Sequence, residues 1–287
     1  MSSGQQIEAG NFAPPRWALL PFNSIRIVSW NINRGLQLRG VIEFLASAKP
    51  DIAFLQEADL NARRTHHLNI AREIAKELQM NYVFGHEFEE LTQGSPNSPA
   101  YHGQATLSRW PLSNTRLIRF QKQSNFWRPH WFLPDVPPFQ ERIGGRLALV
   151  TEANIAGKMI VTYNLHLESK GDNALRCSQL EETLNDAQRY GSRTPTLVAG
   201  DFNLDASRGC AATLTSRAQF QDAFSNQHVQ TTPSRSLLDR GKVIDWIFTR
   251  GPIHASQAGV NRSVSASDHY PLSVVFRLDD CQGSGNR

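Results

Sequence analysis

Cysteine is scarce in this chain and gives no sign of a structural framework. Among the 287 residues, Cys177, Cys210 and Cys281 are odd in number, widely spaced and without a CxxC pair. This spacing suggests neither a disulfide scaffold nor a zinc site. Unpaired thiols are typical of a reducing compartment, so the cysteines favour a cytoplasmic location.

Long apolar runs are missing as well. No stretch approaches the ~18 consecutive apolar residues that would indicate a membrane-spanning helix. The N-terminus has no charged segment followed by a long apolar one, because the stretch from Trp17 to Leu20 is too short for a signal peptide. We therefore expect neither a transmembrane segment nor a secretory leader.

The chain also lacks a strong charge of either sign. Its net charge of +4 favours an anionic partner without establishing one. Hydrophobic residues make up 40% and charged residues 20%, which is enough apolar surface for a packed core. We expect a flexible tail over residues 1–20, one domain over 21–279 and a polar tail over 280–287. The oligomeric state stays open.

What the sequence does contain is a series of apolar strand patterns that end in polar residues. Helical spacing over 38–49, 66–80 and 174–190 separates some of these strands, which indicates an α/β protein. The strand patterns are 25–30 before Asn31, 52–55 before Glu57, 159–165 before His166, 196–199 before Asp201 and Asn203, 243–248 around Asp245, and 272–276 after Asp268 and His269.

Each of these polar residues has an ordinary structural explanation when it is taken alone. Asn31 suits a turn, His166 suits a hydrogen-bonded position in a core, and Asp245 suits an ion pair with Arg240 or Lys242. Their joint occurrence at strand ends favours a functional site, because a rigid sheet holds such groups in place. Carboxylate and amide oxygens suit Mg²⁺ or Mn²⁺, and a cation of this kind points to phosphoryl chemistry.

Six short motifs in this order resemble those of the endonuclease/exonuclease/phosphatase superfamily, over about residues 25–277. They are Trp30-Asn31, Gln56-Glu57, Asn164 to Leu167, Gly200 to Asn203, Ile244 to Phe248, and Ser267 to Pro271, with Gly103 to Leu112 as a further similar segment. The resemblance implies a DNase I-like fold, a four-layer sandwich of two mixed β-sheets flanked by helices. It also implies an Mg²⁺-dependent or Mn²⁺-dependent phosphoesterase.

The resemblance implies a role for each matching residue. The metal ligands would be Glu57, Asn31 and Asp268. The catalytic residues would be Asp201 and Asn203, which position the water and the phosphate, Asp245 paired with His269 at the scissile phosphate, and His166 as a second acid, base or phosphate-binding group. In DNase I-like members a carboxylate before the Leu-Ser segment partners this last histidine. Tyr101-His102 stands near that place here, which leaves the partner of His166 open.

Residues 121–141 are irregular and rich in aromatic and basic side chains. We expect Trp127, Arg128 and Trp131 in this segment to bind substrate, together with Tyr101 and Arg109. A nuclease would use the loop to stack on bases, a phospholipid or inositol-phosphate hydrolase would place residues 120–132 against a membrane, and the loop could instead cover its own domain. The leading hypothesis is a nuclease with nucleic acid as its partner; a binding module without activity ranks last, because the site residues are intact.

Overall fold

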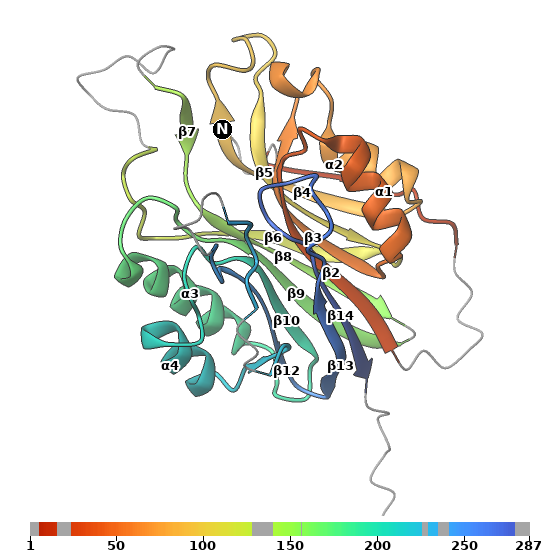
Figure 1. Cartoon of the computed structure of the whole chain (residues 1–287), viewed down its shortest axis with the longest axis vertical. Helices are drawn as coiled ribbons and strands as arrows, with labels where there is room; N and C mark the ends of the chain where they lie inside the picture. Colours follow the sequence, from red (N-terminus) through yellow and green to blue (C-terminus); the bar gives the residue numbers. More distant parts are fainter. Residues whose placement is uncertain are drawn as a thin grey trace, which may run out of the picture.

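Two mixed β-sheets pack face to face in a computed structural model that describes residues 6–15, 24–127, 140–155, 157–225, 229–234 and 241–278 (Figure 1). The first sheet runs, in spatial order, β1 (Ile7–Gly10), β4 (Asn81–Glu90), β5 (Tyr101–Ser108), β3 (Ile52–Leu60), β2 (Ser24–Arg34), β14 (Leu272–Leu278) and β13 (Ile253–Val260), with β7 (Arg142–Gly144) paired to β4. The second runs β11 (Gln221–Asp222), β12 (Asp245–Arg250), β10 (Thr196–Asp201), β9 (Lys158–His166), β8 (Leu147–Ile155) and β6 (Leu112–Arg119).

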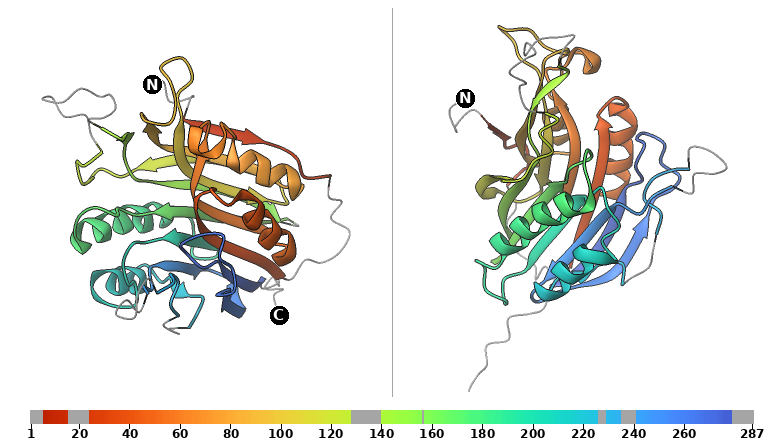
Figure 2. Two further views of the ribbon diagram at one scale, coloured as in Figure 1. Left: turned by 45° about the horizontal axis from the view of Figure 1, so that its top comes forward. Right: turned by 90° about the vertical axis from the view of Figure 1, so that its left-hand side faces the viewer.

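Helices cover the outer face of each sheet, so the molecule has four layers (Figure 2). Against the first sheet lie α1 (Leu38–Ala48) and α2 (Ile70–Glu77), and against the second lie α3 (Asn173–Ala187) and α4 (Gly209–Arg217). A short 3₁₀ helix, η2 (Arg63–Thr65), precedes α2. The four-layer α/β sandwich expected from the sequence is confirmed.

Period-two alternation along the strands divides the core into three parts. Ile27 and Phe54 face the second sheet, whereas their neighbours Val28 and Leu55 pack under α1 and α2. The strands of the second sheet alternate in the same way between the inter-sheet core and the helix layer. A side-chain contact also joins the sheets, because Gln56 Nε2 donates to Asn164 Oδ1 at 2.8 Å in a fully buried position.

Side-chain caps decide where two of the helices begin. Asn69 accepts a hydrogen bond from the Arg72 backbone at 3.0 Å, which starts α2 later than the apolar spacing over 66–80 suggests. Asp172 caps α3 in the same way through the backbone N–H of Leu175 at 2.9 Å.

The structure differs from the sequence-based expectation at the N-terminus. Ile7–Gly10, placed in a flexible tail by its lack of period, forms strand β1 and pairs antiparallel with β4, Ile7 opposite Gly85. A four-residue edge strand is too short to show a pattern, so only the pairing reveals it. The tail over 280–287 lies outside the described residues.

The expectation of unpaired cysteines is wrong for two of them. Cys177 on α3 and Cys210 on α4 form a disulfide, with their Cα atoms 6.1 Å apart. The bond spans 33 residues and depends on how the two helices pack, which sequence spacing does not show. The argument from free thiols to a cytoplasmic location therefore loses its basis. Among the described residues, no helix is long and apolar enough to cross a membrane.

Candidate active site

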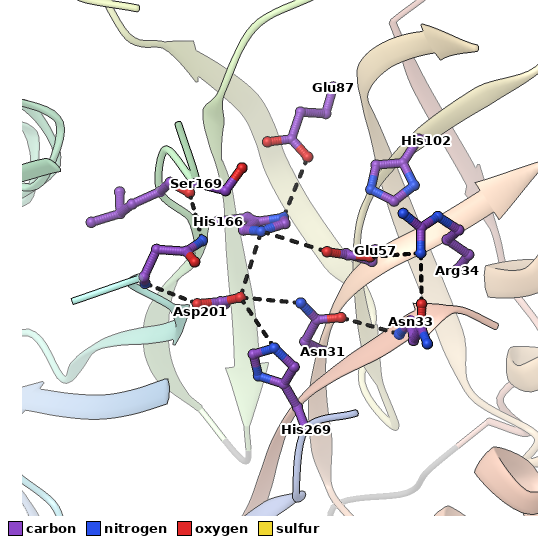
Figure 3. Close-up of polar contacts among 12 residues, drawn as sticks. Asn31, Asn33, Arg34, Glu57, Glu87, His102, His166, Ser169, Asp201 and His269 are labelled. Carbon is purple, nitrogen blue, oxygen red and sulfur yellow. Dashed lines mark hydrogen bonds and ion pairs between the residues drawn. The ribbon is translucent and has the colours of Figure 1, made fainter. Parts of the chain in front are cut away.

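The polar strand ends predicted from the sequence meet at one edge of the two sheets (Figure 3). In the second sheet, Asp201 at the end of β10 pairs with His166 at the end of β9 and with Asp245 at the start of β12. Gly200 makes this register possible. Its φ is +142°, and a Cβ there would lie 2.0 Å from the Leu165 carbonyl oxygen, so only glycine lets β9 and β10 approach so closely.

Asp201 is the centre of the arrangement. Its Oδ2 accepts a hydrogen bond from Asn31 Nδ2 at 3.1 Å and lies 3.6 Å from His166 Nε2 and 3.7 Å from His269 Nε2. Its Oδ1 accepts from the backbone N–H of Asn203 at 2.9 Å. A buried carboxylate that faces two imidazoles and an amide can hold a water molecule and take a proton from it.

His269 and Asp245 form a buried pair. Asp245 Oδ2 and Oδ1 lie 2.8 and 3.1 Å from His269 Nδ1. Burial lowers the pKa of His269, but the carboxylates of Asp245 and Asp201 outweigh it and raise that pKa to about 10. Burial also raises the pKa of Asp245, against the effect of the imidazolium. The two shifts concern one shared proton, which we place on His269 because two carboxylates face this ring.

Backbone contacts fix the turn that carries His269. Trp30 Nε1 donates to the His269 carbonyl at 2.8 Å, and the Ser267 hydroxyl donates to the Asn31 carbonyl at 2.7 Å. This turn also carries Asp268, whose Oδ1 lies 3.5 Å from the Ser267 hydroxyl. The predicted part of Asp268 in metal binding stays a prediction.

Glu57 sits in a β-bulge where the pairing of β3 with both neighbours shifts register. Its φ of +55° turns the carboxylate toward the other strand ends, with Oε1 3.9 Å from His166 Nε2 and Oε2 3.9 Å from Arg34 Nη1. Burial raises the pKa of Glu57, but the electrostatic effects of His102, His166 and Arg34 outweigh it and hold the pKa well below its ordinary value. Glu57 is therefore an anion, and 22% of its side chain is open to solvent.

Two residues partner His166, which the sequence left open: Glu87 on β4 and Arg146 immediately before β8. Arg146 Nη1 lies 2.8 Å from His166 Nδ1 and donates to Glu87 Oε1 at 3.0 Å. The second oxygen of Glu87 lies 3.6 Å from the same imidazole nitrogen. Burial raises the pKa of Glu87, but the charge of Arg146 and the interaction with His166 lower it to about 2. Sequence reasoning missed both residues. The three glutamates among residues 86–90, inside strand β4, were a usable signal for Glu87.

His102, a third residue to which sequence reasoning gave no role, also reaches the site. It lies on β5 beside the bulge. One ligand atom from each of His102, Glu57 and His166 lies within 4.8 Å of the other two. Its Nδ1 lies 3.1 Å from Asp59 Oδ1, and Asp59 is held in turn by Arg64 Nε at 2.7 Å.

Two of the predicted substrate-binding residues, Arg109 and Tyr101, do not join this cluster. Arg109 lies at the opposite end of β3 from Glu57, where its Nε donates to the Pro50 carbonyl at 3.0 Å. Tyr101 precedes His102 on β5 and so projects from the other face, where its ring centroid lies 4.2 Å from that of His86, with the two rings tilted by 32°. The roles of Arg109 and Tyr101 in substrate binding stay predictions.

Trp127 packs inward. Its indole N–H donates to Glu168 Oε1 at 3.2 Å, and its ring lies 5.3 Å from that of Phe88 and 5.1 Å from the Arg142 guanidinium. This contact set supports the local-packing explanation for Trp127. Arg128 and Trp131 lie outside the described residues. Phe126 is exposed by 55%, and the Lys170 ammonium lies 5.3 Å over its ring.

Comparisons with known proteins identify the family of this chain. A model of the endonuclease/exonuclease/phosphatase family matches residues 28–269. No curated protein matches the chain. Similar solved structures include an endonuclease/exonuclease/phosphatase from Beutenbergia cavernae DSM 12333, 16% identical with a TM-score of 0.66 over 90% of this chain and 72% of that one.

Two further structures have the same fold. TDP2 from C. elegans is 19% identical with a TM-score of 0.61, over 89% of this chain and 75% of that chain. An endonuclease/exonuclease/phosphatase from Bacteroides vulgatus is 16% identical with a TM-score of 0.63, over 90% of this chain and 100% of that chain. The chain therefore belongs to the endonuclease/exonuclease/phosphatase family, whose enzymes are phosphoester hydrolases and generally depend on a divalent metal.

Proposed function

We propose that this protein is a divalent-metal-dependent phosphodiesterase that cleaves nucleic acid internally. The observation that carries the proposal is the convergence of His166 and His269 on Asp201, with Nε2 of each ring within 3.7 Å of the same carboxylate oxygen. Two imidazoles around one carboxylate suit a phosphate held between the rings and a water activated by the acid.

The residues also fit a divalent cation. Glu57 is ionised and partly exposed, and the buried His102 Nε2 has no hydrogen-bond partner among the described residues. Glu57 would hold the cation, with Asn31 and Asp268 as further candidates. When bound, such a cation polarises a phosphate oxygen and lowers the charge that an attacking water must meet.

The chain's own groups would perform the proton transfers. Asp201 takes a proton from the attacking water, while Asn203, whose backbone N–H is bonded to the same carboxylate, helps to fix its orientation. His269, held as an imidazolium by Asp245, donates to a phosphate oxygen and has a proton to give to the leaving oxygen. His166 Nε2, on the other imidazole beside Asp201, donates a second hydrogen bond to the phosphate.

A nucleic acid is the substrate that the described surface favours. Phe126 offers an exposed ring beside Lys170, and Lys170 follows His166 by four residues. An aromatic ring paired with a cation near a phosphate site suits a stacked base and its backbone. A membrane contact through residues 120–132 has less support, because Trp127 is directed into the protein and not outward.

A substrate panel tests the proposal. Plasmid DNA, RNA, sphingomyelin, phosphoinositides and a chromogenic phosphodiester are incubated with the protein and Mg²⁺ or Mn²⁺, with EDTA and His269→Ala as controls. We expect nicking of plasmid DNA that EDTA and the variant both abolish. Higher kcat/KM on sphingomyelin or a phosphoinositide would contradict the nuclease assignment, and full turnover in EDTA would contradict the metal requirement.

A further inference from the structure

His102 is buried in the site with one ring nitrogen unaccounted for. Only 1% of its side chain is exposed, and its Nε2 has no hydrogen-bond partner in the part of the chain that the structure describes. A buried polar atom left in this state requires an explanation, and an ion that binds there is one of the few available.

The other ring nitrogen is strongly fixed. His102 Nδ1 lies 3.1 Å from Asp59 Oδ1, and Arg64 holds both oxygens of Asp59, with Nε at 2.7 Å and Nη2 at 2.8 Å. Since a carboxylate can only accept, Nδ1 carries the proton and Nε2 carries the lone pair. A carboxylate behind a histidine is the usual arrangement of a metal-binding imidazole, because it sets both tautomer and ring orientation.

The Glu57 carboxylate lies close to the His102 ring. The ligand atoms of the two side chains lie within 4.8 Å of each other but make no hydrogen bond (Figure 3). Two ligand atoms about 2.1 Å from one cation stand up to roughly 4.2 Å apart. Because part of the Glu57 side chain is exposed, a small rotation of it gives this spacing without moving the buried ring.

His166 is the less suitable nitrogen ligand, although it lies equally near. An arginine N–H can only donate, so the 2.8 Å contact from Arg146 Nη1 makes His166 Nδ1 an acceptor. The proton of the neutral ring is then on Nε2, the atom that faces Glu57 and Asp201. This nitrogen has a hydrogen to donate to a phosphate and no lone pair for a cation.

We propose that His102 Nε2 is a ligand of the divalent cation held by Glu57. The inference rests on the proposed metal dependence and names a ligand that the family motifs do not. Imidazole nitrogen suits first-row transition ions, whereas Mg²⁺ prefers oxygen. The site therefore prefers Mn²⁺ to Mg²⁺, and His102 is the source of that preference.

Electron paramagnetic resonance on Mn²⁺ bound to the full chain, without substrate, tests the assignment. Pulsed spectra of the wild type should show coupling to an imidazole ¹⁴N. His102→Asn should lose this coupling, because the Asn amide replaces Nδ1 toward Asp59 but puts nothing at Nε2. The matched variant His166→Gln should keep it. A wild-type spectrum without ¹⁴N coupling, or coupling that persists in His102→Asn and vanishes in His166→Gln, would overturn the proposal.

Titration of the same proteins with Mn²⁺ and Mg²⁺ gives a second readout. His102→Asn should weaken Mn²⁺ binding much more than Mg²⁺ binding, and equal weakening of both would count against a nitrogen ligand. Asp59→Asn, which keeps His102, should weaken Mn²⁺ binding by about 10- to 100-fold, as expected for the group behind a metal ligand. If His102→Asn does not fold, the ¹⁴N coupling of the wild type and the Mn²⁺ affinity of Asp59→Asn still test whether His102 binds the cation. Because no substrate is present, failure to cleave nucleic acid would be a separate result.

Discussion

The Asp245–His269 pair should act as one catalytic unit, which a double-mutant cycle can show. His269→Ala removes the donor to the phosphate. Asp245→Asn leaves the imidazole in place but removes the carboxylate whose two oxygens lie 2.8 and 3.1 Å from Nδ1. Because both side chains are buried, with 11% of His269 and 3% of Asp245 exposed, water cannot replace the lost partner.

The expected size follows from the chemistry of this contact. Loss of a positioned donor at a developing negative charge costs at least ~100-fold in kcat, or about 2.7 kcal/mol of transition-state stabilisation. Asp245→Asn should cost nearly as much, since the imidazolium depends on that carboxylate. If the two residues act together, the double variant stays near ~100-fold, whereas independent effects would multiply to about 10⁴-fold.

The assay is kcat on a chromogenic phosphodiester at saturating metal, with the free energy of unfolding measured for each variant. Asp51→Asn is a suitable control, since this aspartate lies at the far end of β3, where its Oδ2 accepts from the Arg26 backbone at 2.8 Å. It should leave kcat unchanged. Strictly additive losses would refute the coupling, and a wild-type kcat in His269→Ala would remove this histidine from the mechanism.

Three further outcomes are expected. Replacing Cys177 and Cys210 by serine should lower the free energy of unfolding by about 3–4 kcal/mol, because the disulfide closes a loop of 33 residues and so lowers the entropy of the unfolded chain. An unchanged denaturation midpoint would contradict this prediction. Burial and the charge of Arg119 lower the pKa of His86 from 6.5 to about 4, so only the unfolded chain takes up this proton as pH falls through that range. Stability should thus drop by on the order of 3 kcal/mol from this group between those pH values, a loss absent from His86→Phe in denaturant titrations. Phe126→Ala should weaken DNA binding but not hydrolysis of a small diester; an equal loss on both would exclude a stacking role.

The sequence alone was sufficient to predict the strand ends that form the site. Asn31, Glu57, His166 and Asp201 each follow a run of apolar residues, and such a run marks a strand whatever it pairs with. Neighbouring parallel strands bring their carboxyl ends to one edge, as β2 with β3 and β9 with β10 do here. Local pattern and this rule of sheet geometry therefore place the residues together without knowledge of the full topology.

Only the tertiary structure decided which side chains surround those ends. Glu87 and His102 lie inside strands, and they reach the site because bulges in β4 and β3 shift the register between neighbours. Arg146 meets His166 because β8 and β9 are adjacent in one sheet, and Cys177 meets Cys210 because two helices pack on the same face. These contacts join residues 20 or more positions apart. They depend on register and packing angle, which arise from the whole fold and leave no periodic pattern in the chain.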